Sequence, residues 1–412
     1  MKYAILLIGG DEMNKTICEL FAGVGGFRLG FERESKDWKT VWFSQWEPGK
    51  KNQWAHDCYI SHFGDINEFT CIDIADVDKK SIPNHSLLVG GFPCQDYSVA
   101  RPLSGSSGIE GKKGVLWWQI RDILVEKKPP FVLLENVDRL IKSPANQRGR
   151  DFGIMLACFN ALDYRVEWRV VNAAEYGAAQ KRRRVFIFAY HKNTEYAKTH
   201  DRISQLDTIN QYGFFAKTFP IEKIENTFNG SFENNDIYEI SKNFKFEFYN
   251  SGYMKDGVFS TFKTISIKES PIHLKNILEH NVATQYYLGE NIEDWEKLKG
   301  SKKINRISKS GHQYTFSEGA IPFPDNLNSP ARTILTSETG KSRSTHVIED
   351  PETHKYRFLT PIETERIQGF DDNWTNTGMP HKFRYFCMGN ALVVPMITRM
   401  AKTLNKIIEA EK

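Results

Sequence analysis

The chain has 412 residues, of which 40% are hydrophobic and 26% are charged, and its formal net charge is +4. This composition predicts a globular protein with a sizeable core, and it excludes a disordered or fibrous chain. The net charge is too small to indicate a nucleic-acid partner by itself. The six cysteines form no CxxC pair, so neither a metal site nor a disulfide framework is predicted. No apolar stretch approaches the roughly 20 residues that span a bilayer, and we expect a cytoplasmic protein without a membrane partner.

Short apolar runs alternate with longer amphipathic segments from Thr16 to Ala189. The runs have the length of strands. The expected strands are Ile17–Phe21, Thr40–Phe43, Ser86–Val89, Phe131–Leu134, Tyr164–Val171 and Arg184–Phe188. Helical segments such as Leu116–Glu126 and Phe152–Leu162 lie between them. This alternation predicts an α/β fold with a doubly wound, mostly parallel sheet that is covered by helices on both faces.

The alternation of strands and helices is lost after about residue 192. Residues 193–330 are rich in Asn, Phe, Tyr, Lys and Ser, which predicts irregular and β structure. Further on, Thr360–Gly369 has helical spacing behind a Thr-Pro start, and residues 390–406 predict a closing helix. We therefore expect a catalytic domain of residues 1–192 and 380–412, and a smaller second domain of residues 193–379.

A glycine-rich turn follows the first expected strand, in the sequence Glu-Leu-Phe-Ala-Gly-Val-Gly-Gly of residues 19–26. Glycines there let the backbone approach a ligand, and the following helix N-terminus favours an anionic group. Glu47, after the second strand, is placed to bind ribose hydroxyls. NAD and S-adenosylmethionine fit this pattern equally well, and a tight turn without a ligand also fits.

Cys94 follows the expected strand Ser86–Val89 in the sequence Gly-Gly-Phe-Pro-Cys-Gln-Asp-Tyr-Ser. These neighbours predict an exposed loop at the end of a strand, where ligands bind in open α/β sheets. A free cysteine is otherwise often a small buried hydrophobic residue. We expect this second environment for Cys18, Cys158 and Cys387.

Two more charged segments lie at the ends of expected strands. Glu135 follows Phe131–Leu134, and the basic run Gln180-Lys181-Arg182-Arg183-Arg184 precedes the strand that ends at Phe188. Either segment, taken alone, could also be an ordinary solvated surface.

Motifs along nearly the whole chain resemble, in their order, those of the cytosine-C5 DNA methyltransferase family. They are Phe21-x-Gly23-x-Gly25, Pro93-Cys94-Gln95, Gly114-Val115-Leu116-Trp117-Trp118, Glu135-Asn136-Val137, Gln180–Arg184, Arg332-Thr333-Ile334 and Gly389-Asn390-Ala391-Leu392. The resemblance implies the S-adenosylmethionine-dependent methyltransferase fold and methyl transfer to carbon 5 of cytosine.

The resemblance also implies roles for individual residues. Cys94 would add as a thiolate to ring carbon 6, and Glu135 would hold a proton at ring nitrogen 3. Arg184, together with Arg182, would hold the base carbonyl and a neighbouring phosphate. The base would have to flip out of the duplex. Ser98 and Arg101 would contact the DNA backbone.

The implied methyl donor is S-adenosylmethionine, and no metal is implied. The residues expected to bind the donor are Phe21, Gly23, Val24, Gly25, Glu47, Asp73, Ile74, Pro93, Leu116 and Asn390. The family often places an aromatic residue directly after the ribose-binding acid. Here Pro48 follows Glu47 and Trp46 precedes it, which leaves open which side chain besides Phe21 stacks on the adenine.

The family inserts its target-recognition region before the Arg-Thr-Ile motif, here at about residues 193–328. Lys302, Lys303 and Arg306 in this region are expected to contact phosphates of double-stranded DNA. The sequence is most similar to restriction-system methylases. This implies a short recognition site, with GATC as the candidate, and a cognate restriction endonuclease as functional partner. We expect a monomer.

Three alternatives are weighed against this function. An RNA cytosine methyltransferase on the same scaffold is disfavoured by the long recognition insert. A nicotinamide-dependent oxidoreductase would leave Cys94, Glu135 and the Arg182–Arg184 run without a role. An inactive DNA-binding protein is disfavoured because every expected catalytic side chain is present.

Overall fold

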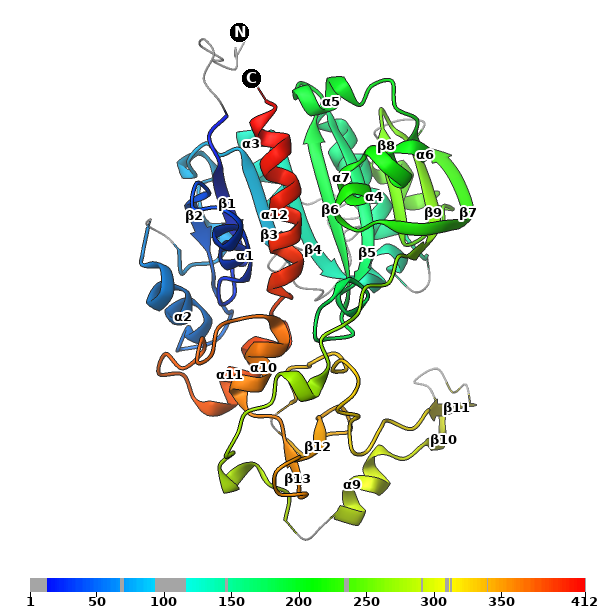
Figure 1. The fold of residues 1–412 in the computed structure, drawn as a ribbon. Helices are drawn as coiled ribbons and strands as arrows, with labels where there is room; N and C mark the ends of the chain where they lie inside the picture. Colours follow the sequence, from blue (N-terminus) through cyan, green and yellow to red (C-terminus); the bar gives the residue numbers. More distant parts are fainter. Residues whose placement is uncertain are drawn as a thin grey trace.

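A sheet of nine strands forms the centre of the protein in the computed structural model. The structure describes residues 13–66, 70–92, 116–144, 147–232, 237–289, 292–307, 311, 313–338 and 340–411. The strand order is β2-β1-β3-β4-β6-β5-β8-β9-β7 (Figure 1). The strands are β1 (Thr16–Leu20), β2 (Lys39–Ser44), β3 (Leu87–Gly91), β4 (Phe131–Val137), β5 (Tyr164–Asn172), β6 (Arg183–His191), β7 (Ile221–Ser231), β8 (Ser251–Lys255) and β9 (Val258–Ser266).

The sheet is mixed, and its two parts differ in strand direction. β1 pairs in parallel with β2 and β3, and β3 pairs in parallel with β4. From β4 to β7 all pairings are antiparallel. The predicted α/β methyltransferase fold is confirmed, and its parallel part is β2-β1-β3-β4. Because these strands are parallel, the carboxyl ends of β1, β3 and β4 meet at one edge of the sheet.

Helices cover both faces of the sheet. Successive residues of a strand point to opposite faces of the sheet, so they belong to different hydrophobic cores. Leu88 and Val132 pack with α3 (Leu116–Lys127) and α4 (Arg150–Ala161), whereas Leu87 and Leu133 pack with helices on the other face. These are α1 (Gly26–Glu34), α7 (Phe214–Thr218) and α12 (Val394–Glu409), and Figure 1 shows α12 crossing this face. The remaining helices are α2 (Trp54–Phe63), α5 (Glu195–Thr199), α6 (Gln205–Asp207), α8 (Ile237–Lys242), α9 (Ile292–Lys299), α10 (Pro361–Gln368) and α11 (His381–Asn390).

The sheet continues past residue 192, where the sequence analysis placed a domain boundary. β8 pairs with β5, and β9 and β7 follow, so residues 221–266 extend the central sheet. The segment before residue 380 also packs on the catalytic part, because Trp374 Nε1 donates to the Val24 carbonyl at 2.8 Å. The expected second domain, residues 193–379, is therefore smaller in the structure. The extension of the sheet was not predicted, because pairing between strands that are far apart in the sequence leaves no signal in the local composition.

A second region with two small sheets lies beyond the central sheet (Figure 1). One small sheet is the hairpin of β10 (Lys302–Ile307) and β11 (Gln313–Glu318), and the other pairs β12 (Val347–Glu349) with β13 (Tyr356–Phe358). α10 follows β13 and begins with a capping box between Thr360 and Glu363, which confirms the helix predicted from the Thr-Pro start.

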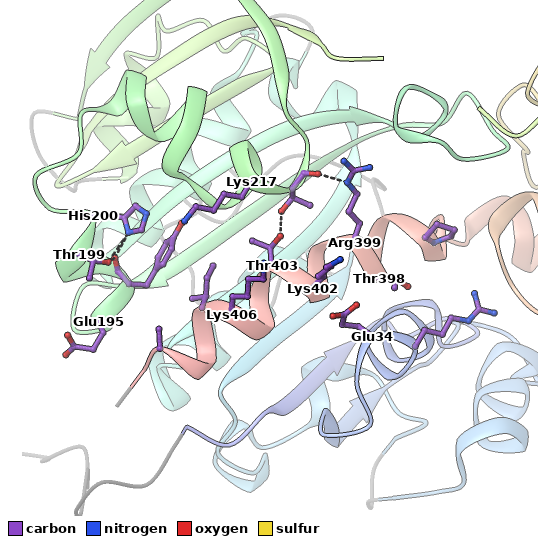
Figure 2. Close-up of a pocket in the computed structure, with 16 residues that line it drawn as sticks. Glu34, Glu195, Thr199, His200, Lys217, Thr398, Arg399, Lys402, Thr403 and Lys406 are labelled. Atoms are coloured by element: carbon purple, nitrogen blue, oxygen red, sulfur yellow. Dashed lines mark hydrogen bonds between the residues drawn. The ribbon is translucent and has the colours of Figure 1, made fainter. Parts of the chain in front are cut away.

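An open groove of about 1040 Å³ runs along α12 and is walled by α5 and α7 (Figure 2). Its basic side chains include Lys217, Arg399, Lys402 and Lys406, and none of the predicted site residues lines it. Among the helices that the structure describes, none is long and apolar enough to cross a membrane.

Candidate active site

The glycine-rich turn and the segment that leads to Cys94 follow β1 and β3, whereas the Glu135 motif forms the last three residues of β4, the strand that was expected to end at Leu134. All three lie at the same edge of the sheet. Leu20 of β1 lies opposite Gly90 of β3, and Gly91 of β3 lies opposite Glu135 of β4. The glycine-rich turn, the segment that leads to Cys94 and the Glu135 motif therefore start side by side. This is the edge at which open α/β sheets bind ligands.

Glu135 forms an ion pair with Arg184 at this edge. Arg184 Nε lies 2.8 Å from Glu135 Oε1, and the two side chains are only 18% and 13% exposed. The contact arises because Arg184 of β6 is paired with Val137, two residues beyond Glu135 in β4. The structure thus brings together two of the four predicted catalytic residues. The partly buried arginine fixes the orientation of the carboxylate.

Asn136 holds the backbone that leads to the predicted nucleophile. Its side-chain Nδ2 donates to the Phe92 carbonyl at 2.9 Å, and its Oδ1 accepts from the backbone nitrogen of Val137 at 2.8 Å. Phe92 is the last described residue before the Cys94 segment. Pro93, Cys94, Ser98 and Arg101 lie outside the described residues.

Arg182 differs from its expected role at the base. Its side chain is 2% exposed, and it donates to the carbonyls of Ile334 and Gly389, at 3.0 Å each. Burial lowers the pKa of its guanidinium to about 9, with the nearby Arg184 acting in the same direction. Arg182 therefore holds two backbone segments together. This structural role of Arg182 could not be predicted from the basic run, because charge alone does not show which arginine points into the protein.

Gln180 and Lys181 form further hydrogen bonds between the same backbone segments. The contact of Gln180–Arg182 with Thr333–Ile334 and Gly389 is called the seam below. Gln180 Oε1 accepts from the Ile334 backbone nitrogen at 2.9 Å, and Thr333 Oγ1 donates to the Lys181 carbonyl at 2.7 Å. The Arg-Thr-Ile motif and the Gly389 motif are thus fastened to the basic motif. Motifs far apart in the sequence form one supporting layer behind Arg184.

Two glycines of the glycine-rich turn have backbone conformations that other residues rarely adopt. Gly23 and Gly25 have φ values of +57° and +87°, in the left-handed region that favours glycine. Gly25 is the N-cap residue of α1. The turn is held from both sides, because the Gly23 nitrogen donates to Gln45 Oε1 at 2.7 Å and Trp374 binds the Val24 carbonyl.

Glu47 presents an acceptor beside this turn. Its Oε2 atom is buried and has no hydrogen-bond partner among the described residues, and burial raises the pKa of the carboxyl. Asp73 caps a short turn by accepting from the Ala75 nitrogen at 3.0 Å, and Ile74 is buried. Leu116 begins α3 and packs on one of the cores, whereas Asn390 is exposed at the end of α11.

Glu19 is a further acid beside the glycine-rich turn and was not predicted as a site residue. Glu19 lies in β1 two residues before Phe21 and is fully buried. Tyr59 donates to its Oε2 at 3.0 Å, while Oε1 has no partner among the described residues. Burial raises the pKa of this carboxyl to about 7. An acid inside an otherwise apolar strand was the available signal.

The five described cysteines have environments that suppress thiolate formation. Cys18, Cys158 and Cys387 are buried, as predicted, and so is Cys58, while Cys71 is partly buried. Burial raises the pKa of all five thiols, to about 11 for Cys158 and about 12 for Cys58. A thiol that resists ionisation is a poor nucleophile at neutral pH.

The sequence profile described as C-5 cytosine-specific DNA methylase matches residues 15–406. The chain belongs to this family. It is 51% identical over 403 residues to the type II methyltransferase M.Sau3AI of Staphylococcus aureus, which covers 96% of this chain and 97% of the relative. It is 28% identical over 394 residues to M1.ScrFI of Lactococcus lactis subsp. cremoris, which covers 96% and 79%. The predicted membership of the cytosine-C5 DNA methyltransferase family, of the restriction-modification type, is thus confirmed.

Solved structures of methyltransferases share the fold. The Entamoeba histolytica methyltransferase EhMeth matches with a TM-score of 0.58 at 16% identity, over 96% of this chain and 99% of that one. A Spodoptera frugiperda DNMT2 mutant matches with a TM-score of 0.59 at 15% identity, over 95% and 99%. At these identities the similarity establishes the fold alone.

The C-5 methylase is therefore an enzyme that transfers a methyl group to carbon 5 of cytosine in DNA, which excludes the oxidoreductase alternative. The family uses S-adenosylmethionine, and the site residues fit this donor. The unpartnered oxygen of Glu47 can accept a hydrogen bond from a ribose hydroxyl, and a Cβ at Gly23 would meet nothing within 4 Å, so the backbone there is open to a ligand.

Proposed function

We propose that this C-5 methylase acts on a flipped-out cytosine in a short double-stranded DNA site, with Cys94 as the nucleophile. The observation that carries the proposal is the Glu135–Arg184 pair, 2.8 Å apart, beside the strand that leads to Cys94. Asn136 supports it further by holding the Phe92 carbonyl. The raised pKa values of the other five thiols leave Cys94 as the cysteine available for nucleophilic attack.

The proposed chemistry uses groups of this chain at defined atoms of the base. The Cys94 thiolate forms a bond to ring carbon 6, and Glu135 holds a proton at ring nitrogen 3 while electron density moves into the ring. Arg184 orients the Glu135 carboxyl, and it would also hold the base carbonyl. S-adenosylmethionine supplies the methyl group that carbon 5 acquires. Loss of the proton from carbon 5 then breaks the carbon–sulfur bond and releases Cys94.

The proposed donor site lies between the glycine-rich turn and Glu47. Glu47 would accept from the ribose, and the backbone of the turn would face the carboxylate of the methionine part. The full set of proposed donor-binding residues is Phe21, Gly23, Val24, Gly25, Glu47, Asp73, Ile74, Pro93, Leu116 and Asn390.

The proposed DNA contacts extend to the second region of the protein. Lys302, Lys303 and Arg306 lie on the β10–β11 hairpin, and the structure describes no ion pair for any of them. They are proposed to contact DNA, together with Ser98 and Arg101 near the nucleophile. The recognition site is proposed as GATC, because the sequence resembles restriction-system methylases, one of which reads GATC. In such a system the enzyme, as a monomer, would protect host DNA from a cognate endonuclease.

A covalent trap tests the proposed nucleophile. Duplexes with 5-fluorocytosine at the target should become cross-linked to the enzyme, because fluorine cannot leave as the carbon-5 proton does. Mass spectrometry should place the adduct on residue 94, and Cys94→Ser should form none while still binding S-adenosylmethionine. A wild-type enzyme that binds the donor but forms no adduct at residue 94 would contradict the mechanism. Bisulfite sequencing of plasmid DNA from expressing cells identifies the methylated site.

A further inference from the structure

The β10–β11 hairpin is a two-stranded ribbon with both faces exposed. Within the described part of the chain, its strands pair with each other and with no strand of the central sheet (Figure 1). Ile304, Ile307 and Tyr314 are 44%, 68% and 43% exposed. A hairpin without a covered face gains little stability from packing, so its composition is free to serve another purpose.

The two faces of the ribbon differ sharply in chemistry. Residues paired across an antiparallel ladder point to the same side, and sides alternate along each strand. The pairs Lys303–Ser317, Asn305–Thr315 and Ile307–Gln313 form one face, hereafter the polar face. Five of its six side chains are polar groups that are capable of hydrogen bonding, and none is acidic. The other face carries Lys302, Ile304, Arg306, Tyr314, Phe316 and Glu318.

The orientation of side chains on both faces is fixed by contacts across the ribbon. Thr315 Oγ1 donates to Asn305 Oδ1 at 3.0 Å, which turns the amide nitrogen of Asn305 outward as a donor. On the other face the Arg306 guanidinium lies 4.1 Å from the centre of the Phe316 ring. The polar face therefore presents donors and acceptors in a preset arrangement, whereas Arg306 is engaged with an aromatic ring.

The base of the ribbon is clamped by a single arginine. Arg343 donates to the Leu298 carbonyl at 2.9 Å and to Gly300 before β10, and it also donates to Gly319 after β11. Lys299 is buried beside it and donates to the Thr345 carbonyl. Both ends of the hairpin are thus held by the loop of residues 340–346.

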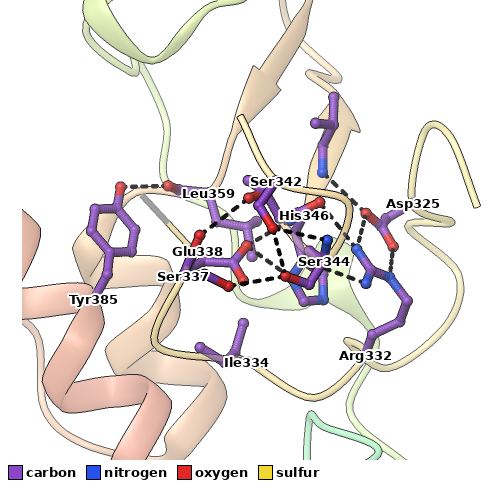
Figure 3. A network of polar contacts seen from close by, with 12 residues as sticks. Asp325, Arg332, Ile334, Ser337, Glu338, Ser342, Ser344, His346, Leu359 and Tyr385 are labelled. Atoms are coloured by element: carbon purple, nitrogen blue, oxygen red, sulfur yellow. Dashed lines mark hydrogen bonds and ion pairs between the residues drawn. The ribbon is translucent and has the colours of Figure 1, made fainter. Parts of the chain in front are cut away.

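This loop connects the ribbon to the catalytic seam. Arg332 donates to the Ser344 carbonyl at 3.0 Å and forms an ion pair with Asp325 at 2.6 Å (Figure 3). The next two residues, Thr333 and Ile334, bind the segment Gln180–Arg182 that precedes Arg184. A continuous series of hydrogen bonds therefore fixes the ribbon relative to the Glu135–Arg184 pair.

We propose that the β10–β11 ribbon enters the major groove of the DNA and that its polar face reads the target sequence, with Lys303 and Asn305 as principal base contacts. The proposal rests on the proposed function. The major groove admits a two-stranded ribbon, and asparagine, glutamine and lysine are side chains that discriminate adenine and guanine there. Lys302 and Arg306, on the opposite face, contact phosphates beside the groove, since a guanidinium that stacks on a ring keeps its N–H donors free at its edge.

Substitutions on opposite faces of one strand test the assignment. Lys303→Ala and Asn305→Ala are compared with Lys302→Ala and Arg306→Ala, and Lys402→Ala in the α12 groove is a control remote from the ribbon. Methylation rates are measured with the full chain on the wild-type site and on all its single-base-pair variants. Each polar-face substitution should lower discrimination at one base-pair position by about 5- to 150-fold. Lys302→Ala and Arg306→Ala should lower the methylation rate of all duplexes by the same factor.

A binding measurement separates this proposal from the proposed function. Competition between the same duplexes is followed by fluorescence anisotropy, without methyl transfer. If the wild type methylates one site and the polar-face variants keep its discrimination, the ribbon assignment is overturned. Loss of discrimination in the Lys302 or Arg306 variants instead would overturn the choice of face. If binding selectivity depends on Lys303 and Asn305 but no cytosine is methylated, the ribbon assignment stands and the proposed function falls.

Discussion

Two basic segments of this C-5 methylase contain the same types of side chain but place them in different environments. In Gln180–Arg184, Arg182 binds two backbone carbonyls, Arg183 pairs with Asp138, and Arg184 pairs with Glu135. In the Lys302–Ile307 strand, the structure describes no acidic partner for the basic side chains, and Lys303 and Arg306 are exposed. The first segment supports the active site, and the second is available for a ligand. The two segments carry similar positive charge in the sequence, and they differ in the residues that surround them in the structure.

The difference has an energetic origin. A buried guanidinium must have hydrogen-bond partners, because desolvation is costly, so its place in the structure is fixed. An exposed lysine or arginine costs little to leave unpaired in water. Substitutions in the first segment should therefore change stability and catalysis, whereas those in the second should change the response to DNA and salt.

The largest effect is expected at the Glu135–Arg184 pair, which is proposed to face the base. Glu135→Gln should slow methylation by about 10²- to 10⁴-fold, because the amide cannot exchange a proton with ring nitrogen 3. Single-turnover kinetics measures the rate, and calorimetry should find S-adenosylmethionine binding retained. Asp138→Asn, three residues along and paired with the neighbouring Arg183, is the control and should have a small effect. A decrease below about tenfold for Glu135→Gln would assign the proton to another group.

A large loss of stability is expected for the buried arginine of the seam. Arg182→Met keeps the volume but removes the donors to Ile334 and Gly389, and should lower the free energy of unfolding by about 3 kcal/mol. Urea denaturation measures the change. Arg183→Met, an exposed neighbour, should change it by less than about 1 kcal/mol. Equal effects of the two substitutions would remove the distinction between buried and exposed arginines within this motif.

The buried Glu19 should give the unfolding free energy a dependence on pH. Its pKa is about 7 in the folded protein and near 4.5 when unfolded, so the folded state binds the proton more tightly. The stabilisation that this tighter proton binding gives is fully present below pH 4.5 and is lost as the pH rises through about 7. The free energy of unfolding falls by about 3 kcal/mol over this range. Relative to wild type, Glu19→Gln should therefore gain about this much stability between pH 4.5 and 8.

Denaturation of both proteins across this pH range checks the expectation. Glu167, whose pKa is also raised to about 7 by burial, is retained in both and cancels from the difference. A difference that does not vary with pH would show that Glu19 does not titrate in this range.

The smallest change in stability is expected at the hairpin. Lys302→Ala and Arg306→Ala should each change the free energy of unfolding by less than about 0.5 kcal/mol. Each should reduce the slope of log affinity for DNA against log salt by about 1, because one phosphate contact is lost. Titrations at several salt concentrations measure the slope, and Lys402→Ala should leave it unchanged. An unaltered slope in both hairpin variants would place the phosphate contacts elsewhere.

Much of the catalytic part could be predicted from sequence because its signals are local. The six strands expected between residues 16 and 189 correspond to β1–β6, and the Thr-Pro start correctly predicted α10. Apolar runs of strand length and capping residues act over a few positions. The extension of the sheet by β7–β9 was missed, because that region is rich in polar residues and pairs with β5 only through the fold.

The amino-acid sequence by itself determined the order of the motifs and the placement of the glycine turn and Glu135 near the carboxyl ends of strands, because short-range periodicity sets where strands lie. Only the tertiary structure decided that Arg184 orients Glu135 while Arg182 is buried against Ile334 and Gly389, and that the Lys302–Glu318 hairpin stays uncovered. The physical reason is that burial depends on segments far apart in the chain. Burial decides whether a charge supports the fold or remains free to bind DNA.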